Sequence, residues 1–357
     1  MTSALTTRPV GRTSIQVTRV GLGTAPIGNL YAPISDEQAV SVVKAALAAG
    51  VNLVDTAPLY GAGVSERRVG AALRDVPRER VVISTKVGRL VEPDGSIPFD
   101  YSRDAVLRSF EESLKRLGVD RIDILHIHDP DDHERQALDE AFPTLAELRA
   151  QGVIGAIGAG MNQWQMLERF ARNADFDCFL LAGRYTLLEQ TSLEFLELCR
   201  SRGIGVFLGG VFNSGILATG PRPGAKYQYA DAPPEIMERA RRLEQVCQRH
   251  GVPLATAAVQ FAAAHPAVTA LVLGAVAPQE FEANLRSLEA AIPTALWEEL
   301  ARRGEIYLGH YEGWYAVRDE AFYGPDEITE RDGQRFAPSG APVEWVREPS
   351  YFFRLSA

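Results

Sequence analysis

The sequence predicts an α/β fold in which eight parallel strands, each followed by a helix, close into a barrel. Two observations carry this prediction. Short segments rich in β-branched residues recur along the chain, and amphipathic helical patterns separate them. Their apolar residues run continuously rather than alternating, which is typical of strands covered on both faces. The eight expected strands are 17–23, 51–55, 81–85, 122–128, 153–158, 178–182, 204–209 and 267–273.

The helical patterns between these segments have sensible ends. The first, 35–50, has Ser35 as its expected N-cap, acidic residues in its first turn, and Gly50 at its expected C-cap. Several of the others also end on glycine just before the next strand, as in a right-handed βα alternation. The other clear helical patterns are 102–118, 139–152, 192–203 and 233–251.

Eight βα units within roughly 290 residues fit a TIM (β/α)8 barrel. Residues 8–17 predict an N-terminal hairpin across its bottom. A doubly wound open sheet is the alternative, but the glycine pattern GxGxxG that such folds carry after their first strand is missing.

Composition limits the partners and the compartment. The 357 residues carry a formal net charge of −9, so no broad positive field is expected to attract nucleic acid or a membrane surface. The cysteines Cys178, Cys199 and Cys247 are odd in number and far apart, which suits a reducing compartment. No apolar leader and no run of about 20 apolar residues is present. We therefore expect a cytoplasmic protein, monomeric or a small homo-oligomer.

The last stretch of the chain departs from the βα rhythm. Residues 305–357 hold 11 of the 30 aromatic residues, and we expect a domain boundary near Gly304, with a barrel over 1–304 and an atypical C-terminal extension over 305–357. The blocks GEIYLGHYEGWYAVRDEAFY and APVEWVREPSYFFRLSA resemble a connective segment of methionyl-tRNA synthetases. The HxGH and KMSKS motifs of those enzymes are absent, so aminoacylation is not implied. An RNA-binding module and a packed aromatic cluster are the open alternatives.

Four residues with reactive side chains lie at the ends of the expected strands or just after them. Asp55 ends the second strand, Tyr60 follows it in DTAPLYG, Lys86 ends the third in STKVG, and His128 ends the fourth in LHIHDP. Because the reactive groups of a TIM barrel come from the C-terminal ends of its strands, these side chains are expected to converge on one mouth.

This combination has a chemical logic. A phenol has an ordinary pKa near 10, but a nearby lysine ammonium favours the phenolate, and a carboxylate keeps that lysine charged and oriented. A neutral histidine can donate to a substrate oxygen. With no obvious nucleophile or metal centre in the sequence, the remaining partner is expected to be a hydride carrier, a nicotinamide cofactor.

At these motifs the chain resembles the aldo-keto reductase family. The stretches VDTAPLYGAGVSERRVGAAL and STKVGRL resemble the branch of aldose 1-dehydrogenases and pyridoxal 4-dehydrogenases, and the likeness covers about residues 8–303. The resemblance implies a TIM barrel in which Asp55, Tyr60, Lys86 and His128 form the catalytic tetrad. In it, Tyr60 is the general acid or base.

The resemblance also implies cofactor-binding positions. After the fifth strand, GAGMN supplies Gly160 and Asn162 to hold the carboxamide, whereas Ala182 and Gly209 stand where the family has a glutamine and a stacking aromatic. The cofactor-binding candidates are Gly23, Thr24, Gly160, Asn162, Phe212, Asn213, Ser214, Gly215, Gly274, Glu280 and Asn284; no metal site is expected.

The eighth-strand loop predicts which cofactor is used. Gly274, Ala275 and Glu280 stand where NADP-preferring members carry a Lys-Ser pair and an arginine. A carboxylate repels a 2′-phosphate and can accept from a ribose hydroxyl, so the loop predicts NAD rather than NADP.

The function expected from the resemblance is oxidation of an aldose of the L-fucose or D-threo type at C1 to its lactone. The alternatives are a pyridoxal 4-dehydrogenase acting on a cyclic hemiacetal, a general aldehyde or ketone reductase, and a catalytically idle binding or regulatory barrel.

Individual residues also have plainer interpretations. Asp55 and Lys86 could form an ordinary ion pair, and Asn162 could merely cap the fifth helix. Glu280 could be a solvated residue in a first helical turn. The histidines His126, His128 and His133 could hold a metal ion.

Overall fold

The computed structural model describes residues 3–30, 32–306, 309–316, 318, 321–323, 328–331 and 334–350. Part of the predicted extension 305–357, including its ending YFFRLSA, therefore lies outside the described residues. The chain divides into two compact units, 1–292 and 293–357, which are described separately.

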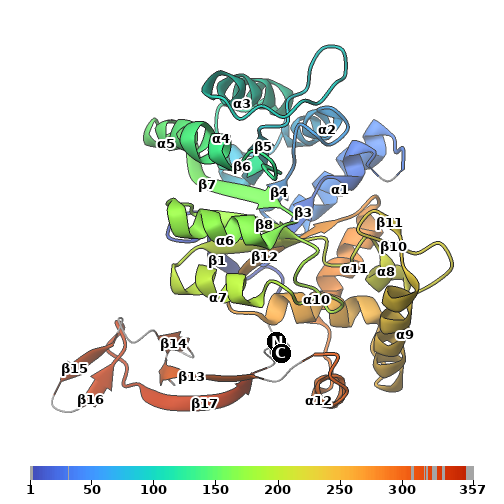
Figure 1. Cartoon of the computed structure of the whole chain (residues 1–357), viewed down its shortest axis with the longest axis vertical. Coiled ribbons are helices and arrows are strands. Elements are labelled where there is room, and N and C mark those ends of the chain that lie inside the picture. The colour runs from blue at the N-terminus through green and yellow to red at the C-terminus, as the bar shows by residue number, and fades with distance from the viewer. Residues whose placement is uncertain are drawn as a thin grey trace. The chain divides into compact units, whose positions relative to one another are not determined.

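The first unit is the predicted barrel. Eight strands close in the order β12-β3-β4-β5-β6-β7-β8-β9, and each lies parallel to both neighbours. Helices surround this sheet (Figure 1). The strands are β3 Val20–Gly23, β4 Leu53–Asp55, β5 Val82–Val87, β6 Ile122–His128, β7 Ile154–Met161, β8 Cys178–Ala182, β9 Gly205–Gly209 and β12 Val268–Gly274.

The first helix shows how the local sequence sets its ends. The Ser35 side chain accepts from the backbone N–H of Gln38, as an N-cap does, which confirms that prediction. The C-cap is Ala49 rather than the predicted Gly50, because Gly50, with φ of 94°, supplies the left-handed residue one position later.

Helices of this unit follow the strands along the chain. They are α1 Asp36–Ala48, α2 Val64–Leu73, α3 Arg103–Leu117, α4 Glu134–Gln136, α5 Phe142–Ala150, α6 Trp164–Asn173, α7 Leu193–Ser201, α8 Ile216–Thr219, α9 Pro234–Arg249, α10 Leu254–Ala264 and α11 Pro278–Glu289, with 3-10 turns η1 Pro26–Gly28 and η2 Arg78–Arg80, a π-helical turn η3 Ala137–Ala141, and a small hairpin of β10 Lys226–Tyr227 and β11 Ala230–Asp231.

The predicted N-terminal hairpin closes the bottom of the barrel. Strands β1 Thr7–Pro9 and β2 Gln16–Thr18 pair antiparallel, and Val10 and Val17 are buried in a core cluster with Phe207 of β9. Gly11 lies so close to the start of β8 that an added Cβ would meet the carbonyl oxygen of Asp177. The C-terminal ends of the strands remain as the mouth.

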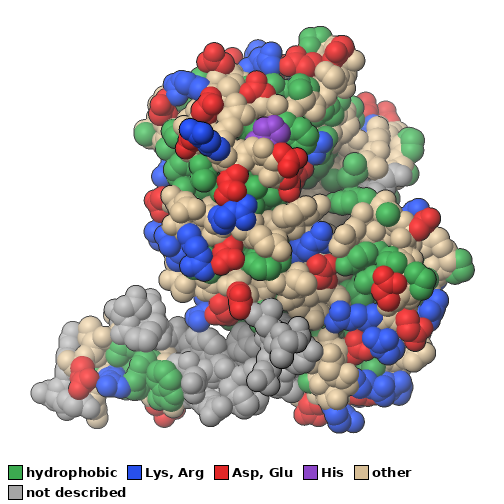
Figure 2. Space-filling view, in the orientation of Figure 1, with side chains coloured by type: hydrophobic (Ala, Val, Ile, Leu, Met, Phe, Trp, Pro, Cys, Tyr) green, Lys and Arg blue, Asp and Glu red, His purple; other side chains and the backbone are tan. Residues whose placement is uncertain are grey.

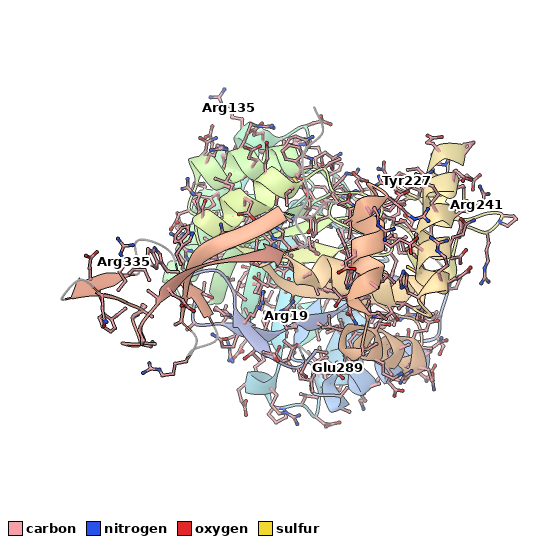
Figure 3. The ribbon with its side chains drawn as sticks, turned by 90° about the horizontal axis from the view of Figure 1, so that it is seen from below. Arg19, Arg135, Tyr227, Arg241, Glu289 and Arg335 are labelled. Atoms are coloured by element: carbon pink, nitrogen blue, oxygen red, sulfur yellow. The ribbon has the colours of Figure 1, made fainter. Side chains whose placement is uncertain are left out.

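The N-terminal segment is also fixed to the last helix of the barrel. Glu289 of α11, labelled in Figure 3, accepts from the Ser3 hydroxyl and from the Ala4 backbone N–H, each at 3.1 Å. These bonds join residues 285 or more positions apart, so they tie the start of the barrel to its end.

The described part of the second unit consists of one helix and short antiparallel strands. Its small core contains Ala316, Ala337 and Ala341. Trp314 and Trp345 lie edge to face at 5.2 Å, and the guanidinium of Arg335, labelled in Figure 3, lies 4.3 Å from the Trp314 ring centroid. The elements are α12 Thr294–Arg302, the sheet β14 Ala321–Tyr323, β13 Gly309–Ala316 and β17 Glu344–Ser350, and the hairpin β15 Thr329–Arg331 with β16 Gln334–Phe336.

The surface mixes charges of both signs. Figure 2 shows acidic and basic side chains interspersed over the face in view. Among the residues that the structure describes, none of the helices is both long and apolar enough to cross a lipid bilayer.

Candidate active site

The four sequence-predicted residues come together at the mouth of the barrel. Asp55 and His128 are the last residues of β4 and β6, Lys86 lies one residue before the end of β5, and Tyr60 lies in the loop after β4. The parallel register aligns Asp55 with Ser84 and Lys86 with His126, so neighbouring strands present their side chains at similar depth.

Asp55 and Lys86 form a buried ion pair. Lys86 Nζ donates to Asp55 Oδ2 at 2.8 Å and to the Thr56 carbonyl oxygen at 2.7 Å, while the Ser84 hydroxyl donates to Asp55 Oδ1 at 2.8 Å. Burial alone would lower the pKa of Lys86, but the charges of Asp55 and Tyr60 outweigh it and raise that pKa. The lysine is therefore held as an ammonium.

Tyr60 lies over this ion pair. Its ring centroid is 4.9 Å from Lys86 Nζ, and its side chain is half-buried. Burial raises the pKa of Tyr60 to about 12, although Lys86 opposes the rise. Lys86 favours the phenolate, as the sequence predicts, but the pKa of Tyr60 is raised overall because desolvation of the phenolate outweighs the attraction of the ammonium.

One close backbone approach positions Tyr60. Gly28, in the η1 turn after β3, lies against Tyr60, and a Cβ on Gly28 would come within 2.8 Å of the Tyr60 carbonyl group. Only glycine fits this contact without a shift of the backbone that carries the phenol.

His128 completes the group. Its ring stands edge-on to Tyr60 with the centroids 6.2 Å apart. Burial, followed by the charges of Lys86 and Arg89, lowers the pKa of His128 well below its ordinary value, so the imidazole is neutral at pH 7. A neutral imidazole has one N–H donor to offer to a substrate oxygen.

The other two histidines have different surroundings. His126 is buried inside the barrel edge-on to Phe207, and His133 packs against Phe99 and Tyr101 outside it. Within the described residues, no group of three or more His, Cys, Asp or Glu side chains is placed to hold a metal ion.

The first two cofactor-binding candidates lie at the end of β3. Gly23 pairs in register with Gly274 and with Asp55. The Thr24 hydroxyl is fully buried, where it bonds to the Asp55 carbonyl oxygen and accepts from Ser65 Oγ. The Thr24 side chain therefore secures the strand ends beneath the mouth.

The fifth-strand candidates lie beside His128. Gly160 of β7 pairs with His128, and a Cβ on Gly160 would lie 3.7 Å from Lys86 Cε. Asn162 follows β7 and is half-buried. The N-cap of α6 is Gln163, without a side-chain bond, so the interpretation of Asn162 as a helix cap was wrong.

The seventh-strand candidates form a left-handed turn after β9. Asn213, Ser214 and Gly215 have φ values of 46°, 58° and 100° in succession. Thr186 donates to Asn213 Oδ1 at 2.6 Å, and the Tyr229 backbone N–H donates to Ser214 Oγ at 3.0 Å. Phe212 precedes this turn, and its carbonyl oxygen accepts from the N–H of Gly215.

The candidates after the eighth strand form hydrogen bonds within their own loop. Asn284 Nδ2 donates to the Gly274 carbonyl oxygen at 3.3 Å, and Glu280 Oε2 accepts from the Val276 backbone N–H at 2.9 Å. Glu280 thus has a local role in this loop. Because a carboxylate can accept several hydrogen bonds, this role leaves it able to meet a further donor.

The structure adds residues that the sequence analysis did not single out. Ser84 braces Asp55 and lies two positions before Lys86 on the same strand, so strand periodicity could have found it. Arg89 NH1 lies 2.9 Å from Asp129 Oδ2, and Asp129 directly follows His128. The sequence gives no sign that these last two side chains pair.

The whole barrel matches one protein family. Residues 19–303 match the model of the Aldo/keto reductase family. Pyridoxal 4-dehydrogenase from Microbacterium luteolum is 43% identical over 84% of this chain and 97% of that protein. D-threo-aldose 1-dehydrogenase from a Pseudomonas species is 40% identical over 80% of this chain and 94% of that protein.

Solved structures show the same fold. The holo form of an aldo-keto reductase from Bacillus halodurans superposes with a TM-score of 0.71, covering 84% of this chain and 96% of that one at 24% identity. A separate likeness covers a small segment of the chain: methionine–tRNA ligase of Brucella suis is 59% identical over 64 residues, which are 18% of this chain and 12% of the ligase. This match agrees with the resemblance of the extension to a synthetase segment.

Proposed function

This chain belongs to the aldo/keto reductase family, and we propose that it oxidises an aldose of the L-fucose or D-threo type at C1 to the lactone, with hydride transfer to NAD. The observation that carries the proposal is the convergence of Tyr60, the Lys86–Asp55 ion pair and neutral His128 on one barrel mouth. Together these groups can take a proton from a substrate oxygen or give one to it.

Each residue has a distinct role in this proposal. His128 donates to the C1 oxygen and orients it. The Tyr60 oxygen, as phenolate, takes the proton of the C1 hydroxyl while the C1–H bond breaks with its electron pair and C1=O forms. Lys86 stabilises the phenolate by its charge, and Asp55 holds the lysine in place. In the reverse direction, the Tyr60 phenol donates its proton to a carbonyl oxygen.

The donor set at the rim fits a nicotinamide dinucleotide. Asn162 and the backbone of Gly160 would hold the carboxamide, and the turn Asn213–Gly215, with the Ser214 hydroxyl, would face the phosphates. Within this turn the N–H groups of Asn213 and Gly215 already donate to the carbonyl oxygens of Gly210 and Phe212, so the Ser214 hydroxyl would supply the donor to a phosphate oxygen. When bound, oxidised nicotinamide supplies the hydride acceptor.

Glu280 supports NAD over NADP within the proposal. Its carboxylate is fixed by the bond to Val276 N at the start of α11. A 2′-phosphate at this place would meet a negative charge, whereas a ribose hydroxyl would meet an acceptor. The remaining cofactor-binding candidates, Gly23, Thr24, Phe212, Gly274 and Asn284, would shape the cleft rather than carry charge.

The test is turnover by the full chain. Purified protein is assayed with L-fucose, D-arabinose, L-galactose and pyridoxal for NADH formation from NAD and for NADPH formation from NADP. The proposal expects an aldose to give the highest kcat/KM, with NAD. If every substrate is inert in both directions, a general aldehyde or ketone reductase and an idle barrel become the alternatives, and turnover of simple aldehydes with NADH or NADPH separates them.

Pyridoxal oxidation is the second candidate. The observation that favours it is the 43% identity to a protein named pyridoxal 4-dehydrogenase. A cyclic hemiacetal offers Tyr60 and His128 the same carbinol bond as an aldose. A higher kcat/KM with pyridoxal than with all three sugars would replace the first candidate with this one.

We further infer the setting in which the barrel works. The family match ends at residue 303, which supports a barrel over 1–304 and an added segment over 305–357. The three cysteines are free and buried, which supports a reducing, cytoplasmic setting. A monomer or a small homo-oligomer is expected, and light scattering measures which.

A further inference from the structure

Asp129 is held in an unusual backbone conformation next to His128. Its φ of 46° lies in the left-handed region, and its N–H donates to the carbonyl oxygen of Gly160 at 3.0 Å. The buried Tyr101 hydroxyl lies 2.6 Å from the carbonyl oxygen of His128 and 2.8 Å from that of Asp129. Surroundings that hold a non-glycine residue in this conformation commonly serve a functional site.

This backbone places the carboxylate of Asp129 beside the imidazole. Asp129 Oδ2 lies 3.6 Å from His128 Nε2, and the side chain is 27% exposed at the mouth. The carboxylate is therefore within reach of a molecule whose oxygen bonds to His128.

Arg89 fixes the same carboxylate from the loop after β5. Its NH1 lies 2.9 Å from Asp129 Oδ2, and its guanidinium stacks 4.7 Å from the centroid of the Phe99 ring. Burial raises the pKa of the Asp129 carboxyl, and Arg89 opposes the rise. Oδ2 therefore faces both Arg89 and His128, and because a carboxylate oxygen has two lone pairs it can still accept from a substrate hydroxyl.

We propose that Asp129 is a specificity-determining residue that accepts a hydrogen bond from a hydroxyl on the carbon adjacent to the reacting carbon. This inference rests on the proposed function, because His128 must bind the reacting oxygen. Because Asp129 Oδ2 is 3.6 Å from His128 Nε2, a hydroxyl on the carbon next to an oxygen bound by His128 can reach the carboxylate. The substrate class is accordingly a neutral vicinal diol or hydroxy-hemiacetal, and an anionic group at the adjacent carbon is disfavoured by charge.

The experiment compares L-fucose with 2-deoxy-L-fucose, which lacks only the adjacent hydroxyl. Values of kcat/KM with NAD are measured for the wild-type chain, Asp129→Ala, Asp129→Asn and Asp131→Asn. Asp131 is a matched control, because it is an exposed acid two residues along the same loop. Thermal unfolding of each variant checks that it is folded.

A hydrogen bond to a charged group implies a preference of about 10- to 100-fold for L-fucose in the wild type. Asp129→Ala is expected to abolish this preference, so that the ratio of kcat/KM for L-fucose to that for 2-deoxy-L-fucose falls to about 1. Asp129→Asn should retain part of the preference, and Asp131→Asn all of it.

Two results overturn the inference while the proposed function stands. One is a wild type that oxidises both sugars equally, and the other is an Asp129→Ala variant that slows both sugars by the same factor, since this indicates a purely structural role. A wild type that oxidises neither sugar but oxidises pyridoxal overturns both the inference and the aldose assignment.

Discussion

Lys86 Nζ lies 2.8 Å from Asp55 Oδ2, and the two side chains are 1% and 3% exposed. The two charges compensate each other. Lys86 also donates to the Thr56 carbonyl oxygen, and Asp55 accepts from the Ser84 hydroxyl. The pair keeps an ammonium under the Tyr60 ring at the mouth of the barrel.

Asp55→Asn tests how strongly the free energy of unfolding depends on this ion pair. The substitution leaves a buried ammonium without its counter-charge, which costs about 3–5 kcal/mol of unfolding free energy. Urea unfolding measures the loss. Adding Lys86→Met to Asp55→Asn should recover part of it, because no unpaired charge then remains. Exposed Asp75→Asn is the control and should change stability by less than about 0.5 kcal/mol.

The pH dependence of the proposed oxidation follows from Tyr60. Because burial raises its pKa to about 12, the phenolate fraction increases tenfold with each unit rise in pH as long as the pH is below that pKa. We expect log kcat/KM for aldose oxidation to rise with a slope near 1 from pH 7 to pH 9, while carbonyl reduction, which uses the phenol, changes little there. Initial rates in both directions measure this, and an oxidation plateau below pH 8 would argue against it.

Stability at low pH is expected to depend on Glu197. It lies 3.2 Å from Nε2 of buried His265. Burial would raise its pKa, but His265 and Arg200 outweigh burial and lower that pKa to about 2. A depressed carboxyl pKa stabilises the fold above the ordinary value of 4.5 and loses this effect as the pH falls towards 2.

Glu197→Gln should therefore be less stable than the wild type at pH 7, with a difference that shrinks between pH 4.5 and pH 3. Denaturant unfolding at each pH measures it. Glu194→Gln, at an exposed position of the same helix, is the control. A difference of constant size across this range would show that Glu197 acts through packing rather than charge.

Cofactor choice is expected to depend on Glu280. Glu280→Arg replaces a carboxylate with a cation and removes the bond to Val276 N. The ratio of kcat/KM with NAD to that with NADP should fall at least about tenfold, since a phosphate then gains an attractive partner. Steady-state kinetics with both cofactors measures the ratio. An unchanged ratio would place the ribose away from Glu280.

The sequence predicts the barrel well because each strand is buried on both faces and leaves a continuous apolar signature, as in β6 and β8. Strand ends then bring Asp55, Lys86 and His128 together by topology alone. Properties that depend on side-chain packing could not be predicted from the sequence. The net pKa shift of Tyr60 depends on its desolvation, and the pairing of Arg89 with Asp129 joins two loops.

In the proposed NAD-dependent oxidation, Tyr60 moves the proton. The most direct test is Tyr60→Phe, assayed for kcat with L-fucose and, separately, for NAD binding by fluorescence titration. We expect kcat to fall by about 10²–10⁴-fold while the Kd for NAD stays within about threefold of the wild type. A Tyr60→Phe variant that retains wild-type kcat would contradict the account.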